Sequence, residues 1–136
     1  MRIIGLDVGE KRIGVALSDP TELIASPLTT ILRTECMSDI QEISRLMIQN
    51  DVGTMVVGLP LELSGRLGFQ ANKIVQFVEI LSRNINIPVE FADERLSSIM
   101  AEKLLRETGI KPSRNKGRID AAAAAVILQR YLDDNQ

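Results

Sequence analysis

Apolar residues in the first part of the chain follow a strand-like pattern. Residues 2–8 and 11–18 are both rich in aliphatic side chains, and the short connection between them at Gly9 is typical of an antiparallel hairpin. A further run over residues 23–32 is patterned as a third strand. The pattern therefore predicts three strands in succession.

The remainder of the chain alternates between helical and strand-like spacing. Ser38, with Gln41 three residues later, resembles a capping box and predicts the start of a helix that ends before Gly53. Strands are predicted over residues 54–58 and 87–92, and helices over residues 66–82, 97–107 and 118–132. This order predicts an α/β fold in which a mixed five-stranded sheet is covered by helices on both faces, with residues 1–136 as one domain.

The first strand presents two different faces. Because side chains alternate along a strand, Ile3, Gly5 and Asp7 share one face, while the intervening aliphatic residues share the other. Gly5 and Gly14 leave room for an element that packs closely on the sheet. Both faces are therefore expected to be covered.

Asp7 is unusual because it places a carboxylate at the exit of a buried strand. A buried charge is costly unless it is paired or bound to a metal ion, which makes Asp7 a candidate metal ligand. Alternatively, Asp7 is a turn residue whose carboxylate accepts hydrogen bonds from amides around Gly9. This segment alone favours neither interpretation.

Asp120 lies early in the last predicted helix, on the same face as Ala124, Ile127 and Leu128. Its carboxylate is therefore expected to point toward the sheet, and the neighbouring alanines allow the helix to approach the sheet closely. A stabilising interaction with the helix dipole would also account for an acidic residue here. It would not account for the alignment of Asp120 with the apolar stripe.

Asp93 and Glu94 end the strand that begins near residue 87. Ligands of open α/β sheets gather at the carboxyl ends of the parallel strands, so these residues could join Asp7 and Asp120. Only one of the two can follow the inner face, and either could instead cap the next helix. Converging carboxylates repel one another unless a cation such as Mg²⁺ lies between them. Two such ions could support phosphodiester cleavage.

The composition narrows the possible chemistry. The chain has no histidine and one cysteine, which excludes His-based general base catalysis and structural zinc sites. The net charge of −2 does not imply a general attraction to nucleic acid. No apolar run is long enough to span a bilayer, and the single cysteine excludes an internal disulfide, so a cytoplasmic location and no membrane contact are expected.

Basic residues flank the candidate carboxylates and predict contacts with a phosphate backbone. They are Lys11, Arg12, Arg95, Arg114, Lys116 and Arg118, together with Lys111. Alternatively, these side chains are simply solvated, and Arg95 pairs with Asp93. The few aromatic residues are expected to lie mostly on apolar faces, so backbone shape and 2′-hydroxyl groups are more plausible recognition features than base stacking.

Four motifs in order along the chain resemble those of the YqgF family of Holliday-junction-resolvase-like nucleases. They are Gly-Leu-Asp-Val-Gly-Glu-Lys-Arg-Ile-Gly-Val-Ala at 5–16, Val-Gly-Leu-Pro at 57–60 with Ser-Gly at 64–65, Asp-Glu-Arg-Leu-Ser-Ser at 93–98, and the segment 120–132 that begins Asp-Ala-Ala-Ala-Ala. The resemblance implies a ribonuclease-H-like fold and a nuclease dependent on Mg²⁺ or Mn²⁺. It further implies processing of the 5′ end of precursor 16S ribosomal RNA in the cytoplasm.

Carried onto this chain, the resemblance implies that Asp7, Glu94 and Asp120 are catalytic metal ligands, with Asp93 as a further metal ligand. Alternatives are a Holliday-junction resolvase acting on branched DNA and a non-catalytic RNA-binding assembly factor. If the substrate is RNA, association with the ribosome is a further expectation. An ATP-binding protein related to actin and hexokinase is a weaker alternative, because such proteins enclose the nucleotide between two domains. A monomer is expected, since no apolar stripe is left over as a dimer surface.

Overall fold

The computed structural model describes residues 1–61, 64, 66–93 and 116–135, and for residues 116–119 it describes the backbone alone. The strands are β1 (Arg2–Val8), β2 (Arg12–Ser18), β3 (Ala25–Leu32), β4 (Val52–Leu59) and β5 (Val89–Asp93). The helices are α1 (Cys36–Gln49), α2 (Phe69–Arg83) and α4 (Lys116–Asp134). The helix predicted over residues 97–107 lies outside the described residues.

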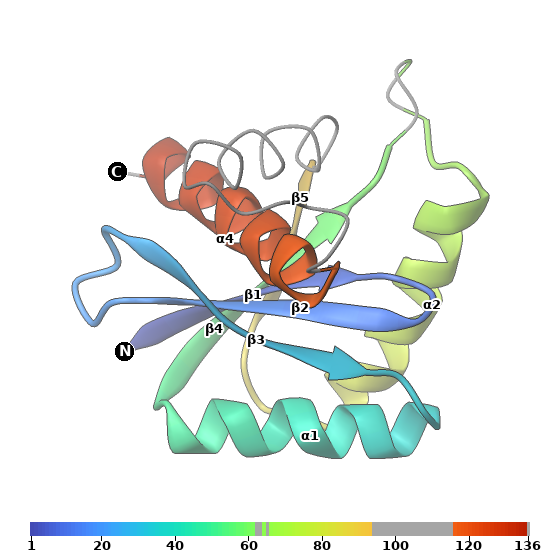
Figure 1. Cartoon of the computed structure of the whole chain (residues 1–136), viewed down its shortest axis with the longest axis horizontal. Coiled ribbons are helices and arrows are strands. Elements are labelled where there is room, and N and C mark those ends of the chain that lie inside the picture. The colour runs from blue at the N-terminus through green and yellow to red at the C-terminus, as the bar shows by residue number, and fades with distance from the viewer. Residues whose placement is uncertain (62–63, 65, 94–115, 136) are drawn as a thin grey trace.

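The five strands form one mixed sheet in the order β3-β2-β1-β4-β5. β1 pairs antiparallel with β2, β2 antiparallel with β3, and β4 parallel with both β1 and β5. Helix α4 lies across one face of the sheet, whereas α1 and α2 lie on the other side (Figure 1). The predicted mixed five-stranded sheet with helices on both faces is confirmed.

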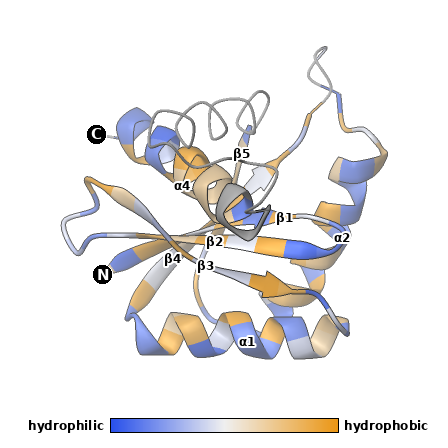
Figure 2. Ribbon diagram, in the orientation of Figure 1, coloured by the Kyte–Doolittle hydropathy of each residue, from blue (hydrophilic) through white to orange (hydrophobic). Residues whose placement is uncertain are grey.

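Two apolar cores follow from the alternation of side chains in β1. Ile4, Leu6 and Val8 pack in the larger core with buried residues of α1 and α2. Ile3 packs in the smaller core, beneath Leu128 of α4. Only one side of α1 is covered by the core, and Figure 2 accordingly shows both hydrophilic and hydrophobic bands along this helix. None of the described helices is both long and apolar enough to cross a membrane.

The predicted start of α1 at a Ser38 capping box is wrong. The helix begins at Cys36, its N-cap residue Glu35 makes no side-chain cap hydrogen bond, and Ser38 is exposed within the first turn. Instead, buried Asp39 accepts a hydrogen bond from the backbone N–H of Thr34 at 3.0 Å. The carboxylate of Asp39, which lies within the helix, therefore stabilises the backbone that precedes the helix.

Strand β3 begins at Ala25, later than the prediction at residue 23, because Asp19 organises the preceding loop. The Asp19 carboxylate accepts hydrogen bonds from the backbone N–H groups of Leu23 and Ile24, both at 2.8 Å. These hydrogen bonds hold the pKa of Asp19 well below its ordinary value. The largest contribution comes from the N–H of Ile24, and the next from the hydroxyl of Thr21. The remaining described elements begin and end within three residues of the predicted bounds.

Candidate active site at the carboxyl end of the central strands

Asp7 lies near the carboxyl end of β1 and is half-buried. Its Cα partner across the antiparallel ladder is Gly14 of β2, and such partners lie about 4.5–5.5 Å apart. Asp7 alternates in phase with Ile3 and Gly5, so it belongs to the face that α4 covers. It therefore faces the start of that helix.

Helix α4 touches this face almost backbone to backbone. A Cβ atom built on Gly14 would lie 2.0 Å from the carbonyl oxygen of Asp120, and one on Gly5 would lie 2.9 Å from the Cβ of Leu128. The close packing predicted for these two glycines is confirmed. Because Gly14 is also the partner of Asp7, Asp7 and Asp120 are brought together although 113 positions separate them in the chain (120 minus 7).

Asp120 is paired with a cation in this arrangement. The Nε atom of Arg12 donates a hydrogen bond to Oδ2 of Asp120 at 2.7 Å, and the two side chains are 29% and 27% exposed. Arg12 begins β2 and has the same alternation phase as Gly14, which places it on the face of α4. The residue that the sequence suggested as a phosphate contact thus contacts a candidate metal ligand.

Successive side chains of β5 point to opposite faces of the sheet. Glu90 accepts a hydrogen bond from the hydroxyl of Tyr131 on α4, and Ala92 packs against the core beneath α4. The Glu90 carboxylate is the main cause that raises the pKa of Tyr131 to about 12. Alternation therefore places Asp93 on the opposite face from Ala92, away from α4.

Several predicted site residues lie outside the described part of the chain. Glu94, Arg95 and Arg114 belong to this group, whereas Lys116 and Arg118 are placed only by their backbone in the first turn of α4. Lys11 is exposed in the turn that precedes β2. Among the described residues, no group of three or more His, Cys, Asp or Glu is arranged to hold a metal ion. The described part of the site therefore consists of Asp7, Asp120 and Arg12.

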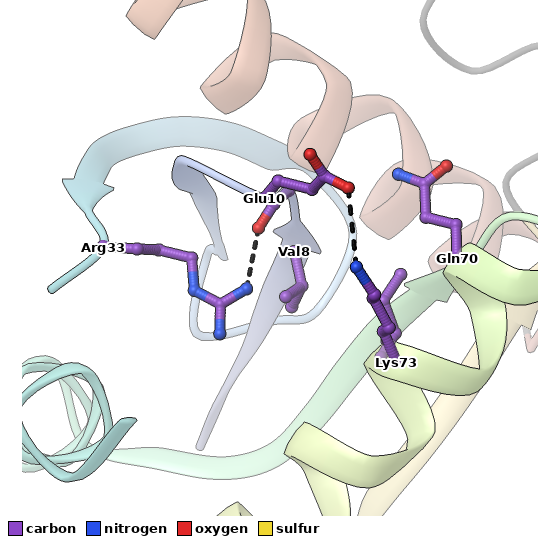
Figure 3. A pocket seen from close by; sticks show the side chains of 7 residues that line it. Val8, Glu10, Arg33, Gln70 and Lys73 are labelled. Carbon is purple, nitrogen blue, oxygen red and sulfur yellow. Dashed lines mark hydrogen bonds and ion pairs between the residues drawn. The ribbon is translucent and has the colours of Figure 1, made fainter. Parts of the chain in front are cut away.

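Arg33 holds the turn that follows Asp7, a role that the sequence did not suggest (Figure 3). Its Nη1 atom donates a hydrogen bond to the carbonyl oxygen of Gly9 at 2.8 Å, and its Nε atom lies 3.5 Å from Oδ2 of Asp39. The guanidinium carbon also lies 4.9 Å from the ring centroid of Phe77. Arg33 thereby joins the β1–β2 turn to α1 and α2.

On the outer side of the same turn, the Nζ atom of Lys73 lies 3.8 Å from Oε1 of Glu10, as Figure 3 also shows. This pair is well exposed and is expected to contribute little to stability. Lys73 Nζ also lies 4.5 Å from the ring centroid of Phe69, which is 78% exposed. Phe77 is buried as expected, but Phe69 at the start of α2 and Phe91 are exposed, so the expectation that most aromatic residues lie on apolar faces is wrong.

We expect Asp39→Ala to lower the free energy of unfolding by about 2–4 kcal/mol, because Asp39 is buried and its removal leaves the Nε atom of Arg33 and the Thr34 N–H without their acceptor. Urea denaturation followed by circular dichroism measures the change. Glu42→Ala is the matched control on the same helix, since Glu42 pairs with Arg45 on the exposed side. The control should leave the midpoint nearly unchanged, and an equal effect of both substitutions would contradict the role of Asp39.

Comparison with families of known proteins gives a match along almost the entire chain. Residues 1–134 match the family model RuvX, described as a Holliday junction resolvase. A protein of Chloroflexus aggregans is 51% identical over 131 residues, covering 96% of this chain and 92% of the relative. A protein of Trichormus variabilis is 48% identical over 130 residues, covering 96% and 86% respectively. Both relatives carry the name "Putative pre-16S rRNA nuclease".

The chain is also similar in fold to solved resolvase structures. RuvC of Thermus thermophilus in complex with a Holliday junction substrate aligns with a TM-score of 0.62 and 13% identity, covering 99% of this chain and 96% of that one. The fowlpox virus resolvase bound to Holliday junction DNA aligns with a TM-score of 0.59 and 16% identity, covering 99% of each chain. At these identities the similarity concerns the fold, and it agrees with the ribonuclease-H-like architecture predicted above.

Proposed function

Because the chain belongs to the RuvX family of Holliday junction resolvases, we propose that it is a metal-dependent nuclease that processes the 5′ end of precursor 16S ribosomal RNA in the cytoplasm. The observation that carries the proposal is the close approach of α4 to Gly14, which sets Asp120 beside Asp7 at the carboxyl end of the central strands. The names of the most similar relatives support RNA as the substrate.

The proposed catalytic residues are Asp7, Asp120 and Glu94, whose carboxylate oxygens would hold Mg²⁺ or Mn²⁺. The alternation of β5, in which Glu90 and Ala92 face α4, supports the choice of Glu94 rather than Asp93 as the third acid. When bound, the ions would activate the attacking water and stabilise the leaving oxygen of the phosphodiester. The donor set fits these ions, because Asp7 and Asp120 offer only oxygen atoms, which hard divalent cations prefer.

The carboxylates need cationic groups beside them if a phosphate backbone is to approach. We assign this role to Lys11, Arg12, Arg95, Arg114, Lys116 and Arg118. Lys11 lies in the turn before β2, and Arg12 begins β2 two residues before Gly14, the partner of Asp7. The start of α4 carries Lys116 and Arg118, four and two residues before Asp120. The two basic segments therefore flank the same pair of carboxylates.

Branched DNA is the second candidate substrate, because the family description and the structural similarity to resolvases both favour it. A symmetric resolvase would require two copies of the chain on one junction, whereas we propose a monomer. A non-catalytic assembly factor that contacts precursor RNA, alone or on the ribosome, would keep the basic surface without needing the carboxylates. ATP binding is not supported by the family to which the chain belongs.

A side-by-side cleavage assay tests the proposal. Precursor 16S ribosomal RNA and a four-way DNA junction are each incubated with the protein, with and without Mn²⁺, and the products are mapped. We expect Mn²⁺-dependent cleavage near the 5′ end of the RNA at a higher rate than cleavage of the junction. Faster cleavage of the junction would indicate a resolvase, and tight RNA binding without cleavage would indicate an assembly factor.

A further inference from the structure

The Arg12–Asp120 ion pair engages a carboxylate of the proposed metal site. It joins the first residue of β2 to the start of α4 through a short, charged hydrogen bond of 2.7 Å. Oδ2 of Asp120 is the acceptor, so this oxygen is engaged by the guanidinium group.

A divalent ion and the Arg12 guanidinium would compete for Asp120. Both seek carboxylate oxygens, and two cations that share one carboxylate repel each other at short range. Arg12 is about a quarter exposed and begins its strand, beside the turn at residues 9–11. Its side chain can therefore leave Asp120 by rotamer changes without any rearrangement of the sheet.

We propose that Arg12 is a positioning residue that acts as an exchangeable counter-cation: it holds Asp120 while no divalent ion is bound, and moves to a substrate phosphate when the ion and the nucleic acid bind. This inference rests on the proposed function, because it assumes that Asp120 is a metal ligand. Binding of the divalent ion and binding of the nucleic acid are therefore coupled, since each makes binding of the other more favourable. Metal binding to the protein without nucleic acid should therefore be weakened by Arg12.

Direct Mn²⁺ titration of the full chain by calorimetry, without nucleic acid, tests the competition. Arg12→Gln removes the competing cation, so its Mn²⁺ dissociation constant should be about three- to tenfold lower than that of the unmodified protein. Arg12→Lys keeps the charge but loses the Nε donor, and its constant should lie between the two. Lys73→Gln is the matched control, because it removes an exposed positive charge that pairs with Glu10 on the α2 side of the same turn, and its constant should change by less than about twofold.

Binding of labelled precursor RNA, followed by fluorescence anisotropy with Ca²⁺ in place of Mn²⁺, gives the second readout. Here Arg12→Gln should weaken binding by about three- to tenfold, because one phosphate contact is lost. Tighter metal binding combined with weaker RNA binding would not follow from a merely structural role. Equal or weaker Mn²⁺ binding by Arg12→Gln, in a protein that cleaves with Mn²⁺, would overturn the inference while leaving the proposed nuclease function in place. Absence of Mn²⁺-dependent cleavage of either substrate by the unmodified protein would instead overturn the proposed function itself.

Discussion

Replacing Asp7 or Asp120 by asparagine should lower Mg²⁺- or Mn²⁺-dependent cleavage by at least about 10³-fold, because each substitution removes a charged oxygen ligand worth several kcal/mol to the transition state. Asparagine has nearly the same shape as aspartate, so the packing of α4 over Gly14 should persist. Single-turnover cleavage rates at saturating metal measure the effect. Thermal denaturation should show that both variants remain folded.

Three comparisons make this experiment specific to the proposed site. Glu10→Gln removes a carboxylate from the same turn, but Glu10 pairs with Lys73 on the side of α2, so its rate should stay within about threefold of the unmodified protein. Glu94→Gln should match the loss in Asp7→Asn, whereas Asp93→Asn should have the smaller effect, because Asp93 alternates away from α4. Full activity of either Asp7→Asn or Asp120→Asn would refute the assignment.

The second large effect is expected for Gly14→Ala. The new Cβ would lie 2.0 Å from the carbonyl oxygen of Asp120 and 2.3 Å from its carbonyl carbon, and backbone atoms cannot move aside as a flexible side chain can. Helix α4 must therefore shift away from the sheet. We expect a loss of about 3–4 kcal/mol in the free energy of unfolding, measured by urea denaturation, together with a loss of cleavage.

Gly53→Ala is the control for adding a methyl group to a glycine within this sheet. There the new Cβ would meet the side chain of Met1, with Sδ at 2.9 Å, and Met1 is 69% exposed and can move into solvent. Its stability should change by less than about 1 kcal/mol. The loss of stability in Gly5→Ala should lie between those of Gly53→Ala and Gly14→Ala, because its new Cβ would lie 2.9 Å from the Cβ of Leu128. A Gly14→Ala variant as stable as Gly53→Ala would contradict the close contact.

Much of the fold followed from local pattern. The alternation of β1 correctly separated Ile3 and Gly5 from Leu6 and Val8, because the two-residue period of a strand holds whatever the strand packs against. The apolar stripe that includes Ala124 and Leu128 likewise identified the buried face of α4. Predictions of this kind succeed because backbone geometry alone relates neighbouring positions.

Predictions that depended on a particular hydrogen-bond partner were less successful. Ser38 had the spacing of a capping residue, but buried Asp39 accepts the bond from Thr34 instead. The sequence does not predict the pairing of Arg33 with Asp39, because both positions are equally compatible with a solvated charge. Whether Asp39 is buried, and so which groups it contacts, depends on how α1 packs against the sheet, and no short segment of sequence specifies that packing.

The sequence by itself therefore determined the strands, the covered faces and the acidic positions at the carboxyl ends of the strands. Only the tertiary structure decided which of these groups meet. Arg12 and Asp120 are 108 positions apart, and their contact depends on the β1–β2 register and on the absence of a side chain at Gly14. Periodicity acts between neighbours along the chain, whereas a short charged contact requires two remote backbones to be placed within a fraction of an ångström of their required separation.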